Sequence, residues 1–168
     1  MIPTLTTARL TLRAPNDSDA AALRAFLQSP RAAWIGGPFA ATDAPEWLAH
    51  GHKMWAEQGR GQWIVARRDD DMPIGRVGLL DHTDWPEPEL AWFLFADFEG
   101  KGYAHEAVIA ARAHANGRLG LPALFSFIEP ANARSRRLAG RLGAHHERDT
   151  RFRGLDFHIF RHPLGEPA

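Results

Sequence analysis

A glycine-rich turn between an apolar run and a helix-forming run constrains the fold of this chain more than any other feature. The turn is Phe98-Glu-Gly-Lys-Gly-Tyr-Ala104. Residues 89–95, just before it, are apolar and aromatic, which is typical of a strand buried on both faces. Residues 104–119, just after it, are alanine-rich with apolar residues at helical spacing, and Gly120 and Pro122 follow as stop signals. The pattern therefore predicts a strand, a tight turn and a helix in immediate succession.

A turn in this position is suited to binding an anion. The first backbone N–H groups of a helix have no helical acceptor, and they lie at the positive end of the helix dipole. Gly100 and Gly102 allow a ligand to approach the backbone without a Cβ in the way. We therefore expect a pyrophosphate to be bound by Glu99, Gly100, Lys101, Gly102, Tyr103 and Ala104.

Two common nucleotide-binding patterns fit this turn poorly. A Walker loop requires Ser or Thr after its lysine, and Gly102 follows Lys101 here. A dinucleotide fingerprint requires a third glycine and a later acid, and both are missing from the expected places. A nucleotide-binding protein and a glycine turn without any ligand both stay open as alternatives at this point.

Three segments together closely resemble the GNAT superfamily of acetyl-CoA-dependent N-acetyltransferases. They are residues 89–95 (ELAWFLF), 99–107 (EGKGYAHEA) and 132–144 (NARSRRLAGRLGA). Residues 6–13 (TTARLTLR) resemble the first strand of the branch that contains the ribosomal-protein alanine N-acetyltransferases. The resemblance covers roughly residues 4–162 and implies acetyl-CoA as co-substrate. Glu99 departs from the family, which often has Gln or Arg there, and an acid beside a pyrophosphate is unfavourable unless only its backbone N–H faces the ligand.

The composition agrees with one globular enzyme domain over residues 1–168. Twenty basic residues balance twenty acidic ones, so no net charge favours a nucleic acid or an anionic membrane as partner. The absence of cysteine excludes thiol catalysis and zinc–thiolate sites. The N-terminus does not resemble a signal peptide, and no apolar run approaches the roughly 20 residues that span a bilayer. We therefore expect a cytoplasmic location.

Hydrophobic periodicity predicts a single mixed α/β sheet. We expect strands at residues 8–14, 62–68, 74–81, 87–95, 123–128, 145–152 and 155–162. We expect helices at residues 17–28, 44–58, 104–119 and 133–142. This β-α-α-β-β-β-α-β-α-β-β order matches the fold of the GNAT family, a mostly antiparallel central sheet flanked by helices.

Amide formation on a thioester requires a base, because the attacking amine must lose a proton. Glu89 is the best candidate, since it begins the strand that leads to the glycine turn. The resemblance implies that an acid here accepts the proton through water. Glu87, two residues earlier on the same predicted strand, is the second candidate. Either residue could instead be a solvated acid at a strand edge.

The resemblance also implies groups that bind the cofactor and stabilise the reaction. The backbone at Phe93, Leu94 and Phe95 would bind the cofactor and the oxyanion, while their side chains lie in the core. Ser135 would lie near the sulfur, although its position favours capping of a helix about equally. Asn132 would bind the pantetheine arm, with capping of the same helix as the alternative. Many family members protonate the thiolate with a tyrosine on the last helix, but the single tyrosine, Tyr103, lies in the glycine turn.

Nine histidines and several tryptophans could suggest other sites. The close pairs His50/His52 and His145/His146 are poorly placed to chelate, because such neighbours point apart on a helix or strand, and we expect no metal. Trp34, Trp47 and Trp55 lie where the family builds its acceptor pocket, and we expect at least two of them in the core.

The sequence thus predicts an acetyl-CoA-dependent N-acetyltransferase that works by direct attack in a ternary complex. No covalent intermediate is expected, because there is no cysteine and no visible Ser-His-acid set. The acceptor is a primary amine, either a peptide N-terminus or a small molecule, and a homodimer is kept open. One alternative is a non-catalytic acyl-CoA-binding or regulatory domain. Another is a nucleotide-binding protein, which would prefer ATP to CoA.

Overall fold

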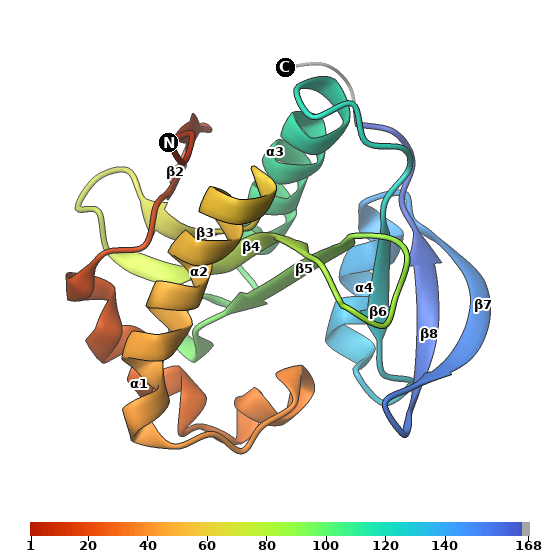
Figure 1. Ribbon diagram of the computed structural model, residues 1–168, viewed down its shortest axis with the longest axis horizontal. Coiled ribbons are helices and arrows are strands. Elements are labelled where there is room, and N and C mark those ends of the chain that lie inside the picture. The colour runs from red at the N-terminus through yellow and green to blue at the C-terminus, as the bar shows by residue number, and fades with distance from the viewer. Residues whose placement is uncertain (166–168) are drawn as a thin grey trace.

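The computed structural model describes residues 1–165, which form one eight-stranded sheet with helices on both faces (Figure 1). The strand order is β1-β2-β3-β4-β5-β6-β8-β7, and β5 with β6 is the single parallel pair in this part of the chain. The predicted fold class is therefore confirmed. Residues 166–168 of the predicted domain lie outside the described residues.

The helices and strands follow the predicted order closely. The strands are β1 (Leu5–Thr6), β2 (Leu10–Arg13), β3 (Gln62–Arg67), β4 (Pro73–Leu80), β5 (Glu89–Leu94), β6 (Phe125–Ile128), β7 (His145–Phe152) and β8 (Leu155–Arg161). The helices are α1 (Ala20–Leu27), α2 (Ala44–Gln58), α3 (Tyr103–Gly117) and α4 (Ala133–Arg141). Within residues 1–165, no helix has both the length and the apolar character needed to cross a bilayer.

The first predicted strand, residues 8–14, is wrong in its bounds. The chain instead forms two short antiparallel strands, β1 and β2, joined by a turn. In that turn the Thr7 hydroxyl (2.6 Å) and the Arg9 backbone N–H (2.8 Å) both donate to the Glu106 carboxylate of α3. Because these contacts are made by a residue 97 or more positions away, local periodicity could not reveal the break.

The central strands β2 to β5 are covered on both faces, by α1 and α2 on one side and by α3 on the other (Figure 1). Along β3, Ile64 packs in the cluster of α1 and α2, while Trp63 packs in the cluster that includes α3. The buried side of α3 consists of small residues, three of them alanines, which lets the helix lie close to the sheet. Trp47 and Trp55 pack in these clusters, as expected for two of the tryptophans, while Trp34 is exposed.

The sheet opens between β5 and β6. The two strands pair at one position, Glu89 with Phe125, and diverge beyond it (Figure 1). Just past this pair, the Ser126 hydroxyl donates to the Leu90 carbonyl, and the Phe127 N–H donates to the Glu89 carboxylate at 3.2 Å. At the end where β5 and β6 still meet, which we call the closed end of the divergence, side-chain hydrogen bonds therefore replace backbone hydrogen bonds between the two strands. The end of β5 on the open side leads into the glycine turn.

Candidate active site

The glycine turn has the geometry of an anion site. Gly100 (φ +73°) and Gly102 (φ +82°) adopt left-handed backbone conformations, and Gly102 is the N-cap of α3. Within residues 1–165, the backbone N–H groups from Gly100 to His105 have no hydrogen-bond acceptor. The Glu99 N–H donates to the Ala96 carbonyl at 3.4 Å, so the free donors begin at Gly100. A Cβ at Gly100 would meet nothing within 4 Å, which leaves open space beside these donors.

Arg9, which directly precedes β2, contacts this turn. Its guanidinium donates to the Lys101 carbonyl (3.0 Å) and to the Glu106 carboxylate (2.7 Å), and it lies 4.6 Å from the Tyr103 ring centroid. Burial raises the pKa of Glu106, but hydrogen bonds from Thr7 and Arg9 outweigh it, so the net shift is downward. Glu106 is therefore held as an anion that fixes Arg9 against the turn.

The unusual acid of the turn, Glu99, is neutralised by two arginines. One carboxylate oxygen accepts from Arg31 and the other from Arg134. Arg31 also donates to the Leu94 carbonyl at 3.3 Å, and its pKa is lowered by burial and by the charge of Arg134. The sequence did not reveal these partners, because Arg31 and Arg134 come from distant segments. The Glu99 carboxylate is thus bonded to two arginines and is not free beside the backbone N–H groups that could bind an anion.

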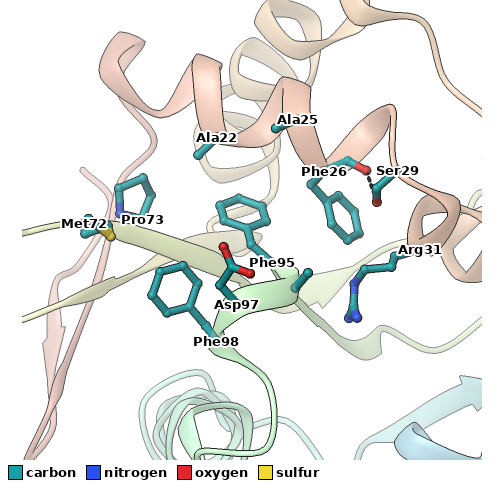
Figure 2. A pocket seen from close by; sticks show the side chains of 11 residues that line it. Ala22, Ala25, Phe26, Ser29, Arg31, Met72, Pro73, Phe95, Asp97 and Phe98 are labelled. Carbon is teal, nitrogen blue, oxygen red and sulfur yellow. Dashed lines mark hydrogen bonds between the residues drawn. The ribbon is translucent and has the colours of Figure 1, made fainter.

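A cavity of about 460 Å³ adjoins the turn between α1 and the end of β5. Figure 2 shows the rings of Phe95 and Phe98 beside the Asp97 carboxylate, with Arg31 at one edge and α1 above. Glu89 lies at the other end of β5 and is not among the lining residues. The cavity therefore belongs to the anion end of the site and not to the end that carries the candidate base.

The backbone prediction for Phe93, Leu94 and Phe95 needs correction. The Phe95 N–H donates to the Ile74 carbonyl of β4 at 2.9 Å. Because backbone groups alternate in direction along a strand, the N–H and C=O groups of Phe93 also point toward β4. The residues whose backbone groups face the divergence are Leu94 and Trp92. Trp92 was missed, although period-two alternation could have found it. The Phe93 and Phe95 side chains pack on Phe26, as predicted for core residues.

Glu89 is the first residue of β5 and is 8% exposed. One carboxylate oxygen lies 2.7 Å from His82 Nε2, and the other accepts the Phe127 N–H. Glu87 precedes β5, contrary to prediction, and its carboxylate accepts a 2.6 Å hydrogen bond from Arg161 that raises the pKa of Arg161. Of the two acids, only Glu89 lies on the strand at the closed end of the divergence.

His82 is a site residue that the sequence analysis missed. It lies in the loop between β4 and β5, which crosses in front of β6 in Figure 1. Its ring packs against those of Phe127 (5.9 Å) and Phe152 (5.3 Å), so the Nε2 atom is held toward Glu89. A histidine seven residues before an acid, across a loop, follows no helical or strand period, and no sequence signal marks it.

Asn132 and Ser135 meet at the start of α4. The Asn132 Oδ1 atom accepts the Ser135 N–H at 3.1 Å, so the capping role is present. Within residues 1–165 the Ser135 hydroxyl and the Asn132 amide N–H groups have no protein partner. Both side chains therefore keep donors that a ligand could use.

The structure also gathers His146, Asp149 and His158, whose ligand-type atoms lie within 4.8 Å of one another. A β-bulge between His146 and Arg148 puts His146 and Asp149 on the same face, beside His158 of β8. Both rings share one Asp149 oxygen, at 2.8 and 2.6 Å, and their hydrogen bonds lower the pKa of Asp149. The histidine pairs considered from sequence did not include this set, because the bulge has no sequence signature.

Comparison with known proteins defines the class of this enzyme. Residues 9–145 match the family model described as "Acetyltransferase (GNAT) domain". An acetyltransferase from Agrobacterium tumefaciens is 35% identical, with a TM-score of 0.88, over 97% of this chain and 95% of that one. The protein is therefore an acyltransferase. It belongs to the GNAT acetyltransferase family, whose members use acetyl-CoA.

More distant structures share the fold. A ribosomal-protein-S5-alanine acetyltransferase from Vibrio fischeri is 16% identical, with a TM-score of 0.77, over 99% of this chain and 100% of that one. A ribosomal L7/L12 α-N-protein acetyltransferase in complex with coenzyme A is 14% identical, with a TM-score of 0.79, over 97% and 99%. These two relatives establish the similarity of fold alone.

Proposed function

We propose that the protein transfers the acetyl group of acetyl-CoA to a primary amine by direct attack in a ternary complex. The observation that carries this proposal is the placement of two features on one strand. β5 begins at buried Glu89 and ends beside the anion turn, a length of about 16 Å in an extended strand. A cofactor with its pyrophosphate at the turn would extend along β5 and bring its thioester toward Glu89.

The turn and the start of α4 would hold the cofactor. The N–H groups from Gly100 to Ala104, through Lys101, Gly102 and Tyr103, would donate to the pyrophosphate. The Glu99 carboxylate would not contact the pyrophosphate, because Arg31 and Arg134 occupy its two oxygens. The free amide of Asn132 would bind the pantetheine arm, and the Ser135 hydroxyl would donate toward the sulfur.

Glu89 would act as the general base. A carboxylate oxygen has room for two hydrogen bonds, so each Glu89 oxygen keeps capacity beyond His82 and the Phe127 N–H. Glu89 would take the amine proton directly or through water as the amine attacks the thioester carbon. The backbone N–H groups of Trp92 and Leu94, which face the divergence, would stabilise the oxyanion. A thiolate leaving group, with a pKa near ~8.5, needs little acid assistance.

We further propose a peptide or protein N-terminus as the acceptor amine. The similarity of fold to two ribosomal-protein acetyltransferases supports this class of acceptor. Membership of an acyltransferase family weighs against the alternative of a non-catalytic acyl-CoA-binding domain.

The test is a mass-spectrometric acetylation assay. The purified protein is incubated with acetyl-CoA and a panel of free-N-terminus peptides, the same peptides with blocked N-termini, and small amines. We expect one acetyl group to appear on free-N-terminus peptides and not on blocked ones. Acetylation of small amines alone would contradict the peptide acceptor. Binding of acetyl-CoA without acetylation of any amine would contradict the transferase proposal itself.

A further inference from the structure

Arg76 of β4 is a buried guanidinium without a hydrogen-bond partner. It is 2% exposed, its Nε atom is fully buried and unpaired, and within residues 1–165 none of its nitrogens donates to protein. Burial lowers its pKa to about 10, with a smaller opposing effect from Asp19, so it is still charged at neutral pH. Because buried polar groups are almost always hydrogen-bonded, an unpaired buried cation requires an explanation.

Space for this cation is built into α2. A Cβ at Gly51, in the interior of α2, would lie 3.0 Å from Arg76 Nη2. Glycine in a helix interior lowers the stability of the helix. At position 51 a larger residue would crowd the guanidinium, which accounts for the glycine there. The Trp47 ring lies 5.8 Å from the guanidinium carbon on the same side.

Asp19 is the acid whose charge acts on Arg76, but its carboxylate oxygens already bond other groups. Its two oxygens accept 2.8 and 2.9 Å hydrogen bonds from Arg13, and one of them also accepts the Asn16 N–H. Asp19 therefore offsets the charge of Arg76 from a distance but does not fill its donors. The geometry leaves a cation that only an added anion would pair directly.

Arg76 lies on the same face of the sheet as the candidate base. Arg76 pairs with Phe93, and Leu80 pairs with Glu89, in one antiparallel ladder. Directly paired residues share a face, and so do residues two and four apart along a strand. Phe93 and Glu89 therefore point to the face of α1 and α2, with their Cα atoms about 13 Å apart along β5. An acceptor with its amine at Glu89 would have to extend about this far along the same face to reach Arg76.

We propose that Arg76 binds a carboxylate of the acceptor, so that the preferred substrate is an amine that also carries a carboxylate. This inference rests on the proposed acetyl transfer and narrows its substrate class. A guanidinium matches a carboxylate with two parallel hydrogen bonds. A site that keeps an unpaired buried charge in the free protein discriminates strongly against an acceptor that cannot pair it.

The first test compares matched acceptors. Amines are offered in pairs that differ only in the carboxylate: free amino acids against their amides, and peptides with Glu against Gln next to the N-terminal residue. We expect wild-type kcat/KM to favour the carboxylate member by at least about tenfold. In Arg76→Met the preference should disappear, mainly through KM, with turnover of the amide retained.

Two further variants control this comparison. Arg76→Lys keeps the charge but not the planar fork, so part of the preference should survive. Arg112→Met removes another arginine with a buried, unpaired Nε, but from α3 on the opposite side of the sheet, and should leave the preference intact. Loss of the preference in Arg112→Met would contradict the assignment to Arg76.

A binding test does not depend on turnover. Thermal unfolding of the CoA-saturated protein is followed with succinate and with succinamide. Succinate should stabilise the wild type and not Arg76→Met, and succinamide should stabilise neither. Arg76→Met should fold, because replacing an uncompensated buried charge by an apolar side chain is commonly stabilising. Equal use of both acceptor types together with no succinate shift would overturn the inference. Failure to acetylate any amine would instead contradict the proposed function.

Discussion

Glu99 places a negative charge beside backbone donors that are arranged for a phosphate. Its two arginine partners, Arg31 and Arg134, explain how the chain accepts an acid there. In Glu99→Gln, both cations become available to the cofactor, so the Kd for acetyl-CoA should fall severalfold. The free energy of unfolding should change by less than about 1 kcal/mol, since these pairs are partly exposed. Titration calorimetry measures the Kd. Glu57→Gln on α2 is the control, and weaker binding in Glu99→Gln would show that Glu99 itself contributes to the site.

His82 is assigned here as a positioning residue for Glu89. In His82→Ala the base would lose the ring at 2.7 Å that orients it, so kcat should fall about tenfold or more, with an unchanged Kd for acetyl-CoA. Added imidazole should restore part of the activity, because it can occupy the vacated space and bond the carboxylate. His50→Ala, an exposed position on α2, should have no effect. A loss of activity without imidazole rescue would indicate a purely structural role.

At the scale of elements, the turns before and after α3 offer a matched pair of glycines. Gly100 (φ +73°) and Gly120 (φ +65°) both adopt left-handed conformations, and an added Cβ meets nothing within 4 Å at either. Alanine at each position should therefore cost a similar 1–2 kcal/mol, roughly, in unfolding free energy. Only Gly100→Ala places its methyl group beside the expected pyrophosphate, so only this variant should bind acetyl-CoA more weakly. Equal Kd values for the two variants would contradict the assignment of the anion site.

The elements themselves could largely be predicted, because hydrophobic periodicity and stop signals are local. The bounds of α2 and β7 agree with the sequence prediction. Two misses involve contacts with distant residues: Glu106 bonds the turn that breaks the first predicted strand, and Arg161 bonds Glu87, which precedes β5. The direction of each β5 backbone group follows from pairing with β4, which periodicity alone did not fix.

At the scale of the whole molecule, the stability of the fold at acid pH depends on His162, which is buried where β5 and β6 meet. Its Nε2 atom lies 2.9 Å from the Ser126 hydroxyl, which in turn bonds Leu90 of β5. Burial, then the charges of Arg112 and Arg161, lower the pKa of His162 from 6.5 to about 4. Between these two values the unfolded chain binds more protons than the folded one, so stability falls as the pH falls from about 6.5 to about 4.

This loss should reach up to about 3 kcal/mol for a single group. Urea unfolding of wild type and His162→Gln between pH 7 and pH 4 measures it. Glutamine can keep the contact with Ser126 but does not titrate, so the pH dependence should be smaller by this amount. Identical pH dependence in the two proteins would show that His162 is not responsible.

The site as a whole was only partly predictable. The glycine turn, Glu89, Asn132 and Ser135 follow from local motifs and from the family resemblance. His82, Arg76 and the arginines around Glu99 do not, because packing of separate segments creates their contacts. Trp92 is a third case. Strand alternation was known from the sequence, but the pairing of β5 with β4, which decides which backbone N–H groups face the divergence, was not.

A paired measurement on Glu89→Gln tests most directly whether Glu89 is the base. Single-turnover acetylation of an amine acceptor gives the chemical rate, and calorimetry gives the Kd for acetyl-CoA. We expect a rate reduced by about 10²–10⁴ with an unchanged Kd, because glutamine keeps the shape of the base but cannot take the proton. A Glu89→Gln enzyme that acetylates at the wild-type rate would show that Glu89 is not the base.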